Sequence, residues 1–174
     1  MKSIFQQLQA LGVGEFVHLH GSLEMHLRGT YDLLTEWGAN TALCEAGLYH
    51  AAYSTAGFEG ALASHEQRDR VIDIIGEQAE QIVYMYCACD RDVVFSRIGK
   101  QQPVFFKDRF TQEEYELSVE QWKQFCELTV ANELEISRNS EQFVEQYGGE
   151  LKELFGRMDR YLSVAAKLAT EKTL

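Results

Sequence analysis

The stretch His26-Leu-Arg-Gly-Thr-Tyr-Asp-Leu-Leu-Thr-Glu-Trp-Gly38, followed by Leu43-Cys-Glu-Ala-Gly-Leu-Tyr-His50, decides the fold. Apolar residues recur in it at helical spacing, and a glycine such as Gly38 typically ends a helix. The two runs therefore predict two antiparallel helices joined by a short turn. His26 near the start of the first helix and His50 at the end of the second would then lie at the same level of a helical hairpin.

Further helices are predicted on both sides of this hairpin. A single proline and long stretches rich in Glu, Gln, Leu and Ala favour helix over sheet. Residues 92–112 contain Gly99 and Pro103, are the least regular part, and are compatible with a hairpin or a closing loop. The predicted helices cover residues 1–11, 22–37, 40–50, 66–75, 78–89, 111–138, 139–147 and 150–171.

Local signals set these boundaries. Ser22 is expected to cap the helix that carries His26. Gly76 is expected to separate two helices, and Gly148-Gly149 two others. The run Thr111-Gln-Glu-Glu resembles a capping box and predicts the start of the longest helix. Because 174 residues with 45% hydrophobic content suffice for one buried core, we expect an all-α single domain of seven or eight helices.

Charge and hydropathy limit the partners. The formal net charge of −11 would repel the phosphate backbone of a nucleic acid, although a local cluster of Arg and Lys could still bind a small anion. The N-terminus lacks the pattern of a signal peptide, and no stretch approaches about 18 uninterrupted apolar residues. We therefore expect a cytoplasmic protein with a small-molecule ligand and no membrane or nucleic-acid partner. Four cysteines without Cys-x-x-Cys spacing are expected to be reduced core thiols: Cys44, Cys87, Cys89 and Cys126.

The histidines suggest a metal site. Neutral imidazole is the commonest metal ligand, and borderline divalent ions favour it. His26 and His50 would supply two ligands, and a site needs three or four. His18 or His20 could supply another from the segment before the first helix of the hairpin. The alternative is that these histidines are ordinary polar residues near helix ends.

Other polar residues are candidates for chemistry or substrate binding. Asp90 could be a metal ligand or general base and Arg91 an anion clamp, or the two could form a helix-terminal salt bridge. Asn132 could face a site or cap a buried backbone group. Tyr53 and Thr55 would place hydroxyls beside His50, or form an ordinary Ser/Thr turn.

Basic and aromatic residues leave further alternatives open. Arg70 is among the basic residues nearest the predicted site in sequence and is a candidate for binding an anionic substrate. Most such side chains are solvated surface charges. The aromatic segment from Phe105 to Phe110 is compatible with a pocket cover or with a contact between two copies of the chain, which would make the protein a homo-oligomer.

These motifs resemble the HD-domain superfamily, and specifically its branch of (p)ppGpp hydrolases. The run from His26 matches the helix that carries that family's first metal ligand, and Ala46-Gly-Leu-Tyr-His50 is similar to its Ala-x-Leu-Leu-His-Asp motif. Thr55, the segment 75–83 and Val130-Ala-Asn132 continue the likeness, which covers about residues 18–136. The chain also resembles a family of HD-like proteins with Trp-Gly, Ala-Gly-Leu-x-His and Cys-x-x-Asp-Arg landmarks.

The resemblance implies an HD-like bundle and a metal-dependent enzyme that hydrolyses a phosphoester of a small molecule. Fe, Mn or Zn is the expected divalent transition metal. Two alternatives stay open: an iron-dependent HD-type oxygenase, and a non-catalytic module that binds a small molecule or a protein. The chain departs from the family pattern, because Ala51 and Asn132 stand where the family has metal-binding aspartates. This loss leaves three outcomes open: a site rebuilt with His18, His20 or Asp90, a site for a different metal, or a non-catalytic binding module.

Overall fold

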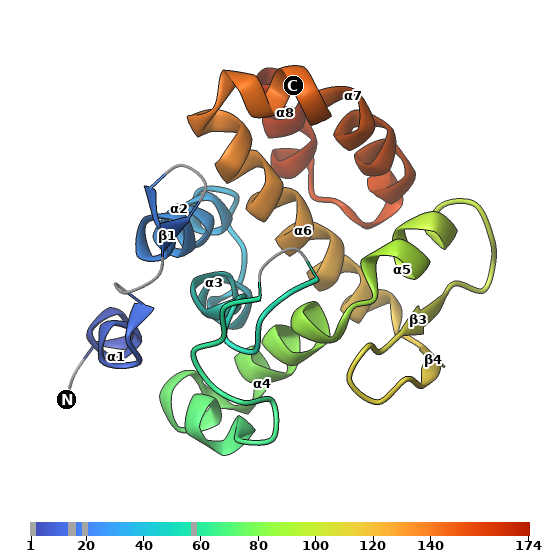
Figure 1. Ribbon diagram of the computed structural model, residues 1–174. Coiled ribbons are helices and arrows are strands. Elements are labelled where there is room, and N and C mark those ends of the chain that lie inside the picture. The colour runs from blue at the N-terminus through green and yellow to red at the C-terminus, as the bar shows by residue number, and fades with distance from the viewer. Residues whose placement is uncertain (1–2, 14–16, 19–20, 57–58) are drawn as a thin grey trace. The chain divides into compact units, whose positions relative to one another are not determined.

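The computed structural model describes residues 3–13, 17–18, 21–56 and 59–174 and is almost entirely helical (Figure 1). Within these residues it contains eight α-helices, one 3-10 helix and two short antiparallel hairpins. The predicted all-α class is confirmed.

Packing along the chain divides it into two compact units, residues 1–87 and 88–174. The expectation of a single domain stays a prediction. The first unit contains both histidines of the predicted hairpin, and the second contains Asp90, Arg91 and Asn132.

The first unit is built around a helical hairpin that an N-terminal helix and a long, broken helix accompany. Its two-residue strands β1 and β2 pair antiparallel just before the hairpin. Its elements are α1 (Ile4–Ala10), β1 (Val17–His18), β2 (Gly21–Ser22), α2 (Leu23–Glu36), α3 (Thr41–Tyr49) and α4 (Arg68–Ala88).

Helices α2 and α3 form the predicted hairpin and lie side by side (Figure 1). Ser22 caps α2 by accepting a hydrogen bond from the Met25 N–H, as predicted. Gly38 follows the end of α2 with a left-handed φ of 76°, a conformation that glycine adopts without strain. Asn40 then caps α3. The chain reverses within four residues, so the two helices run antiparallel.

Gly47 allows α3 to approach α2 closely. A Cβ atom at this position would lie 2.5 Å from Leu34 Cδ1, and Leu34 is completely buried. The missing side chain therefore brings the end of α3, and His50 with it, against α2.

Helix α4 is interrupted at Gly76, where φ is 79° and ψ is 162°. Side-chain-bearing residues rarely adopt these angles, and a Cβ atom there would meet no other atom within 4 Å. Glycine is therefore required at position 76 for its backbone conformation and not for close packing. The predicted separation of two helices at Gly76 is confirmed.

The second unit is organised around its longest helix. Helices α7 and α8 and the 3-10 helix η2 all contact α6, and strand β3 contacts α5. Its elements are α5 (Arg91–Arg97), β3 (Phe105–Lys107), β4 (Glu114–Glu116), α6 (Val119–Asn139), α7 (Glu141–Met158), η2 (Asp159–Tyr161) and α8 (Val164–Thr173).

An aromatic cluster and a hydrogen-bonded carboxylate hold this unit together. Phe106, Trp122 and Phe125 form a buried cluster with ring centroids about 6 Å apart, at 6.3, 5.9 and 5.9 Å. Glu127, on α6, accepts hydrogen bonds from the backbone N–H and the hydroxyl of Ser163, the cap residue of α8. The C-terminal helix is therefore fixed to α6 by a buried carboxylate.

The start of α6 differs from the prediction. The helix begins after Ser118, which forms a capping box with Gln121, and not at Thr111. Thr111 lies in the turn between β3 and β4, where the Asp108 carboxylate accepts its N–H. The error has a physical reason, since Ser118-x-x-Gln121 and Thr111-x-x-Glu114 are equivalent local signals and only pairing with β3 distinguishes them.

Two further helix boundaries differ from the prediction. Helix α7 continues through Gly148 and Gly149 because Gly148 and Leu151 pack against the unit and outweigh the poor helix propensity of glycine. Helix α5 occupies residues that were predicted to be irregular, although a hairpin does follow it. The C-terminal segment splits instead at η2.

Three further predictions concern the cysteines, the aromatic segment and membrane-spanning helices. All four cysteines are free and buried, as predicted for core thiols. Phe106 is buried in the core, and Phe105 is 38% exposed. Among the helices of the described residues, none combines the length and the apolar character needed to cross a membrane.

Candidate functional site

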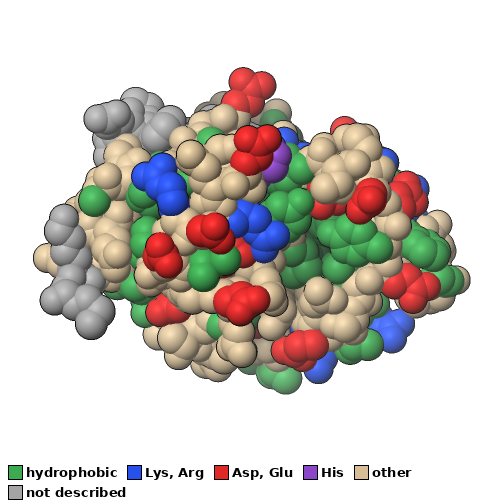
Figure 2. Space-filling view, turned by 90° about the horizontal axis from the view of Figure 1, so that it is seen from below, with side chains coloured by type: hydrophobic (Ala, Val, Ile, Leu, Met, Phe, Trp, Pro, Cys, Tyr) green, Lys and Arg blue, Asp and Glu red, His purple; other side chains and the backbone are tan. Residues whose placement is uncertain are grey.

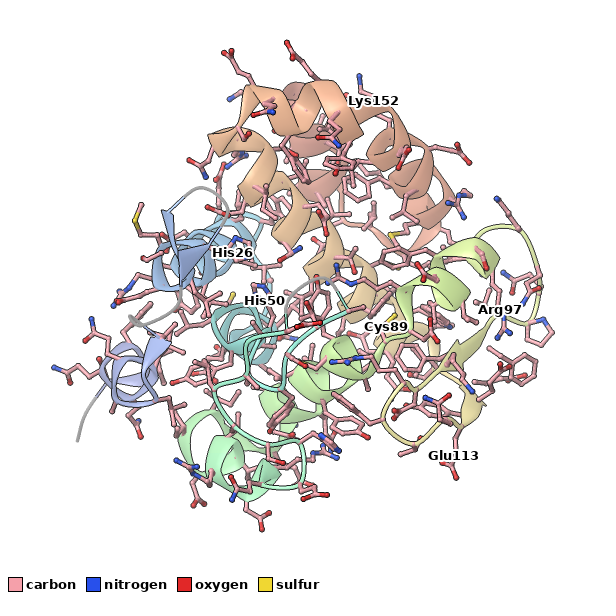
Figure 3. All side chains as sticks on the ribbon, in the orientation of Figure 1. His26, His50, Cys89, Arg97, Glu113 and Lys152 are labelled. Carbon is pink, nitrogen blue, oxygen red and sulfur yellow. The ribbon has the colours of Figure 1, made fainter. Side chains whose placement is uncertain are left out.

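The two histidines of the α2–α3 hairpin meet in the interior of the first unit. Figure 3 shows His26 and His50 close together, and their Nε2 atoms are 3.2 Å apart. The rings are nearly perpendicular, at 83°, and the side chains are only 5% and 2% exposed. The predicted meeting of the two imidazoles is confirmed.

The backbone fixes which nitrogen of His50 carries the proton. His50 Nδ1 lies 2.7 Å from the carbonyl oxygen of Gly47, and a carbonyl can only accept. Nδ1 is therefore the donor, and in neutral His50 the Nε2 atom carries a lone pair directed at His26. In a neutral pair His26 Nε2–H would donate to it.

The distance between the two nitrogen atoms is also compatible with a shared metal ion. Two imidazole nitrogens bound to one tetrahedral ion at about 2.0–2.1 Å are about 3.3 Å apart, close to the 3.2 Å found here. Metal-binding histidines usually donate their other ring N–H to a carbonyl or carboxylate, as His50 does to Gly47. His26 and His50 could thus be two ligands of one ion.

Further ligands are not found among the residues that the structure describes, where no three His, Cys, Asp or Glu side chains form a metal-binding group. Two of the predicted ligands fall outside this search. His20 lies outside the described residues, and only the backbone of His18 is described, in strand β1. That strand contacts α2, the helix that carries His26.

The turn after His50 is buried. Ala51, Ala52 and Tyr53 are each at most 2% exposed, and Thr55 is 7% exposed. Ser54 has a left-handed φ of 64°, which is uncommon for a residue with a side chain and is often found at functional sites. The backbone beside the histidine pair is therefore held in a specific conformation.

The sequence predicts that the Tyr53 hydroxyl faces a cleft and binds substrate. The structure places this hydroxyl elsewhere. It donates a 2.8 Å hydrogen bond to Glu80 Oε1 on α4. Burial, followed by the hydrogen bond to Glu80, raises the pKa of Tyr53 far above its usual value. The phenol is therefore a fixed donor.

Arg68 neutralises Glu80 across the break in α4. Its Nε and Nη2 atoms lie 2.6 and 2.5 Å from the two carboxylate oxygens, and its guanidinium stacks on the Tyr84 ring at 4.1 Å. Glu80 is completely buried. Such a charge is tolerated in the interior only when it is paired and hydrogen-bonded, which Arg68 and Tyr53 together achieve.

Helix α4 also contacts His50 directly. The Cys87 thiol donates a hydrogen bond to the His50 carbonyl oxygen at 3.1 Å. The Tyr86 ring packs edge-on against the His50 imidazole, with centroids 5.5 Å apart. Residues of α4 therefore touch both the backbone and the ring of His50.

Arg70 is the remaining candidate in the first unit. Its side chain is exposed, and its Nη1 atom is 3.4 Å from Gln67 Oε1, a long hydrogen bond. The structure thus places Arg70 at the surface near the start of α4. Its predicted role in binding an anionic substrate stays a prediction.

The candidates in the second unit have local structural partners. Asp90 caps α5 by accepting the Val93 N–H, and Arg91 Nη1 lies 3.7 Å from Glu133 Oε1. Asn132 is buried and donates to the same Glu133 oxygen at 2.9 Å. The catalytic roles predicted for Asp90 and Arg91 stay predictions.

Four residues around His50 were missed from the sequence: Gly47, Glu80, Tyr86 and Cys87. The signal for Glu80 was present, because a carboxylate between Ala79 and Ile82 on an apolar helix indicates a buried, paired charge. Glu80 and Cys87 are also seven residues apart and therefore share a helix face. The contact of Gly47 with Leu34 depends on how two helices cross, which no local pattern gives.

Comparisons with known proteins add one match. The model of a family described as a domain of unknown function, DUF6817, matches residues 7–91, a segment that includes the α2–α3 hairpin, the turn after His50 and α4. No curated protein and no solved structure matches the chain. The matched segment therefore coincides with the part of the chain that builds the histidine pair.

Proposed function

We propose that the protein is a metal-dependent enzyme that hydrolyses a phosphoester of a small molecule. The single observation that carries this proposal is the convergence of His26 and His50, whose Nε2 atoms are 3.2 Å apart in a buried site. The reaction class comes from the resemblance of these two helices to the HD superfamily.

The donor set supports a transition metal. Imidazole nitrogens favour borderline ions such as Fe and Zn over Mg and Ca. His26 and His50 would hold the ion, and His18 or His20 would complete the site from the segment next to α2. When bound, such an ion lowers the pKa of a water molecule to supply a nucleophile and polarises a phosphoryl oxygen.

The charge of the first unit also favours a cation over an anion at this site. Residues 1–87 contain 11 acidic side chains and only four basic ones, which are Lys2, Arg28, Arg68 and Arg70. Arg28 is paired with Glu24, and Arg68 with Glu80. A phosphoester would therefore need the charge of the metal ion to bind in this unit.

Three features of the chain have defined roles in this proposal. The Gly47 carbonyl holds the His50 ring and keeps its Nε2 lone pair directed into the site. The turn next to His50 is buried, with Ala52 completely inaccessible, which limits access of bulk water. Arg70, exposed beside the start of α4, would attract the anionic substrate.

A second candidate is a non-catalytic module in which the two histidines only hydrogen-bond to each other. A specific observation favours it. The position that follows His50, an aspartate in the HD pattern, is the buried Ala51 and offers no ligand. In that case the pair would stabilise the α2–α3 hairpin without a metal.

Metal titration separates the two candidates. Apo-protein would be titrated with Mn²⁺, Zn²⁺ and Fe²⁺, alongside the His50→Ala variant and a His65→Ala control that removes an exposed histidine. The enzyme predicts tight binding in the wild type and the control and none in His50→Ala. Phosphate release from a panel of small phosphoesters, lost in the same variant, would support hydrolysis, whereas oxygen consumption with iron would support an oxygenase. Equal binding in all three proteins would refute the site.

A further inference from the structure

We propose that one face of α4 positions His50, with Glu80 and Cys87 as positioning residues for the histidine pair. The proposal rests on the proposed metal site. Glu80 accepts a hydrogen bond from Tyr53, and Cys87 donates one to His50. The two residues therefore contact opposite ends of the turn that contains His50, Ala51, Ala52 and Tyr53.

The spacing of the two residues explains how one helix does both. Both follow the break at Gly76, in the continuous part of α4. Seven residues correspond to nearly two full helical turns, so Glu80 and Cys87 project from the same face about two turns apart. Both side chains are completely buried. Helix α4 therefore contacts the turn after His50 at both of its ends.

At the Cys87 end the contact is with the backbone of a helix terminus. His50 is the C-cap of α3, and carbonyls at helix ends lack intrahelical partners. The Cys87 thiol donates to this carbonyl, and the neighbouring Tyr86 ring meets the imidazole at 86°. The first contact fixes the position of the His50 backbone, and the second the plane of its ring.

At the Glu80 end the contact is with the side chain of Tyr53. This residue belongs to a turn whose backbone is itself hydrogen-bonded. Backbone hydrogen bonds from Ala52 to Tyr49 and from Ser54 to Ala51 stiffen this segment. Glu80 is itself held in place because Arg68 donates hydrogen bonds to both of its carboxylate oxygens. Loss of the Tyr53 hydroxyl would therefore release one end of a stiff turn whose other end carries a metal ligand.

A positioning role differs measurably from a purely structural one. Tyr49 offers a matched control, because it is equally buried, adjoins His50, and donates its hydroxyl to the Ile4 carbonyl on α1 and not to α4. Tyr49→Phe and Tyr53→Phe each remove a hydroxyl that donates one 2.8 Å hydrogen bond, to a backbone carbonyl in the first case and to the Glu80 carboxylate in the second. Only Tyr53→Phe is expected to disturb His50.

Cys87 offers a second matched pair. Cys87→Ser keeps a donor that can reach the His50 carbonyl, whereas Cys87→Ala removes it. Residues that orient metal ligands typically change metal affinity about 10–100-fold. We expect Tyr53→Phe and Cys87→Ala to weaken Zn²⁺ binding about tenfold or more, and Tyr49→Phe and Cys87→Ser to stay close to the wild type.

The test combines Zn²⁺ titration against a chelator with ¹⁵N NMR of the histidine rings in the metal-free protein. In the wild type, Tyr49→Phe and Cys87→Ser, the His50 signals should report a proton fixed on Nδ1. In Tyr53→Phe and Cys87→Ala they should report averaging between the two nitrogens. The proposal is overturned if the control and test variants behave alike in the NMR measurement. Absence of Zn²⁺ binding in the wild type would refute the metal site instead, and the NMR comparison would still decide the positioning role.

Discussion

Among single residues, Gly47 supports the histidine pair in two ways. Its carbonyl holds the His50 ring, and its missing side chain lets α3 approach Leu34 on α2. We expect Gly47→Ala to destabilise the protein by about 1–2 kcal/mol, because overpacking a buried contact outweighs the gain in helix propensity. The midpoint of urea unfolding, followed by circular dichroism, measures the change.

A second glycine provides the control for this substitution. Gly149 lies inside α7, where a Cβ atom would meet nothing within 4 Å. Gly149→Ala should stabilise the protein by about 0.5–1 kcal/mol through helix propensity alone. A Gly47→Ala protein that is as stable as Gly149→Ala would show that the two helices do not meet as described.

The four thiols allow a test of burial across both units. Burial raises the pKa of Cys44, Cys89 and Cys126 above the usual value, so these thiols stay protonated at neutral and mildly alkaline pH. Since the thiolate is the reactive form, we expect almost no reaction with a thiol reagent at pH 8 in the native protein. All four should react after unfolding in guanidinium. Rapid labelling of a native thiol would contradict its placement in the core.

At the scale of secondary structure elements, two equivalent capping signals compete for the start of α6. Ser118 accepts the Gln121 N–H, whereas Thr111 lies in the hairpin turn. Ser118→Ala should cost about 1 kcal/mol, the usual value of an N-cap, and Thr111→Ala much less. Thermal unfolding of the two variants measures the difference. A larger loss for Thr111→Ala would place the start of the helix there.

The sequence predicted the elements best where local signals agreed with packing. Ser22, Gly38 and Gly76 set boundaries that the structure confirms, because caps and left-handed glycines act within one turn. The glycines at 148 and 149 misled the prediction, since burial of Leu151 outweighs their helix propensity. The meeting of His26 and His50 could be predicted from hairpin spacing, but the partners of His50 on α4 could not, because they lie more than 30 residues away.

At the scale of the whole molecule, charge governs the choice of partner. Figure 2 shows acidic side chains scattered over the visible face, with basic ones interspersed and not gathered into a patch. With a net charge of −11, we expect no binding to a random-sequence DNA duplex or to single-stranded RNA at about 0.15 M salt. Fluorescence anisotropy measures this. Salt-sensitive binding at micromolar protein would contradict the prediction.

The proposed enzyme depends on a metal ion held by His26 and His50. The most direct test is elemental analysis of the protein purified without a metal-affinity tag, beside the His26→Ala, His50→Ala double variant, with circular dichroism to verify folding. We predict Fe, Mn or Zn at close to one ion per chain in the wild type and its loss in the double variant. Metal retained in the folded double variant, or no metal in either protein after supplementation with all three ions, would contradict it.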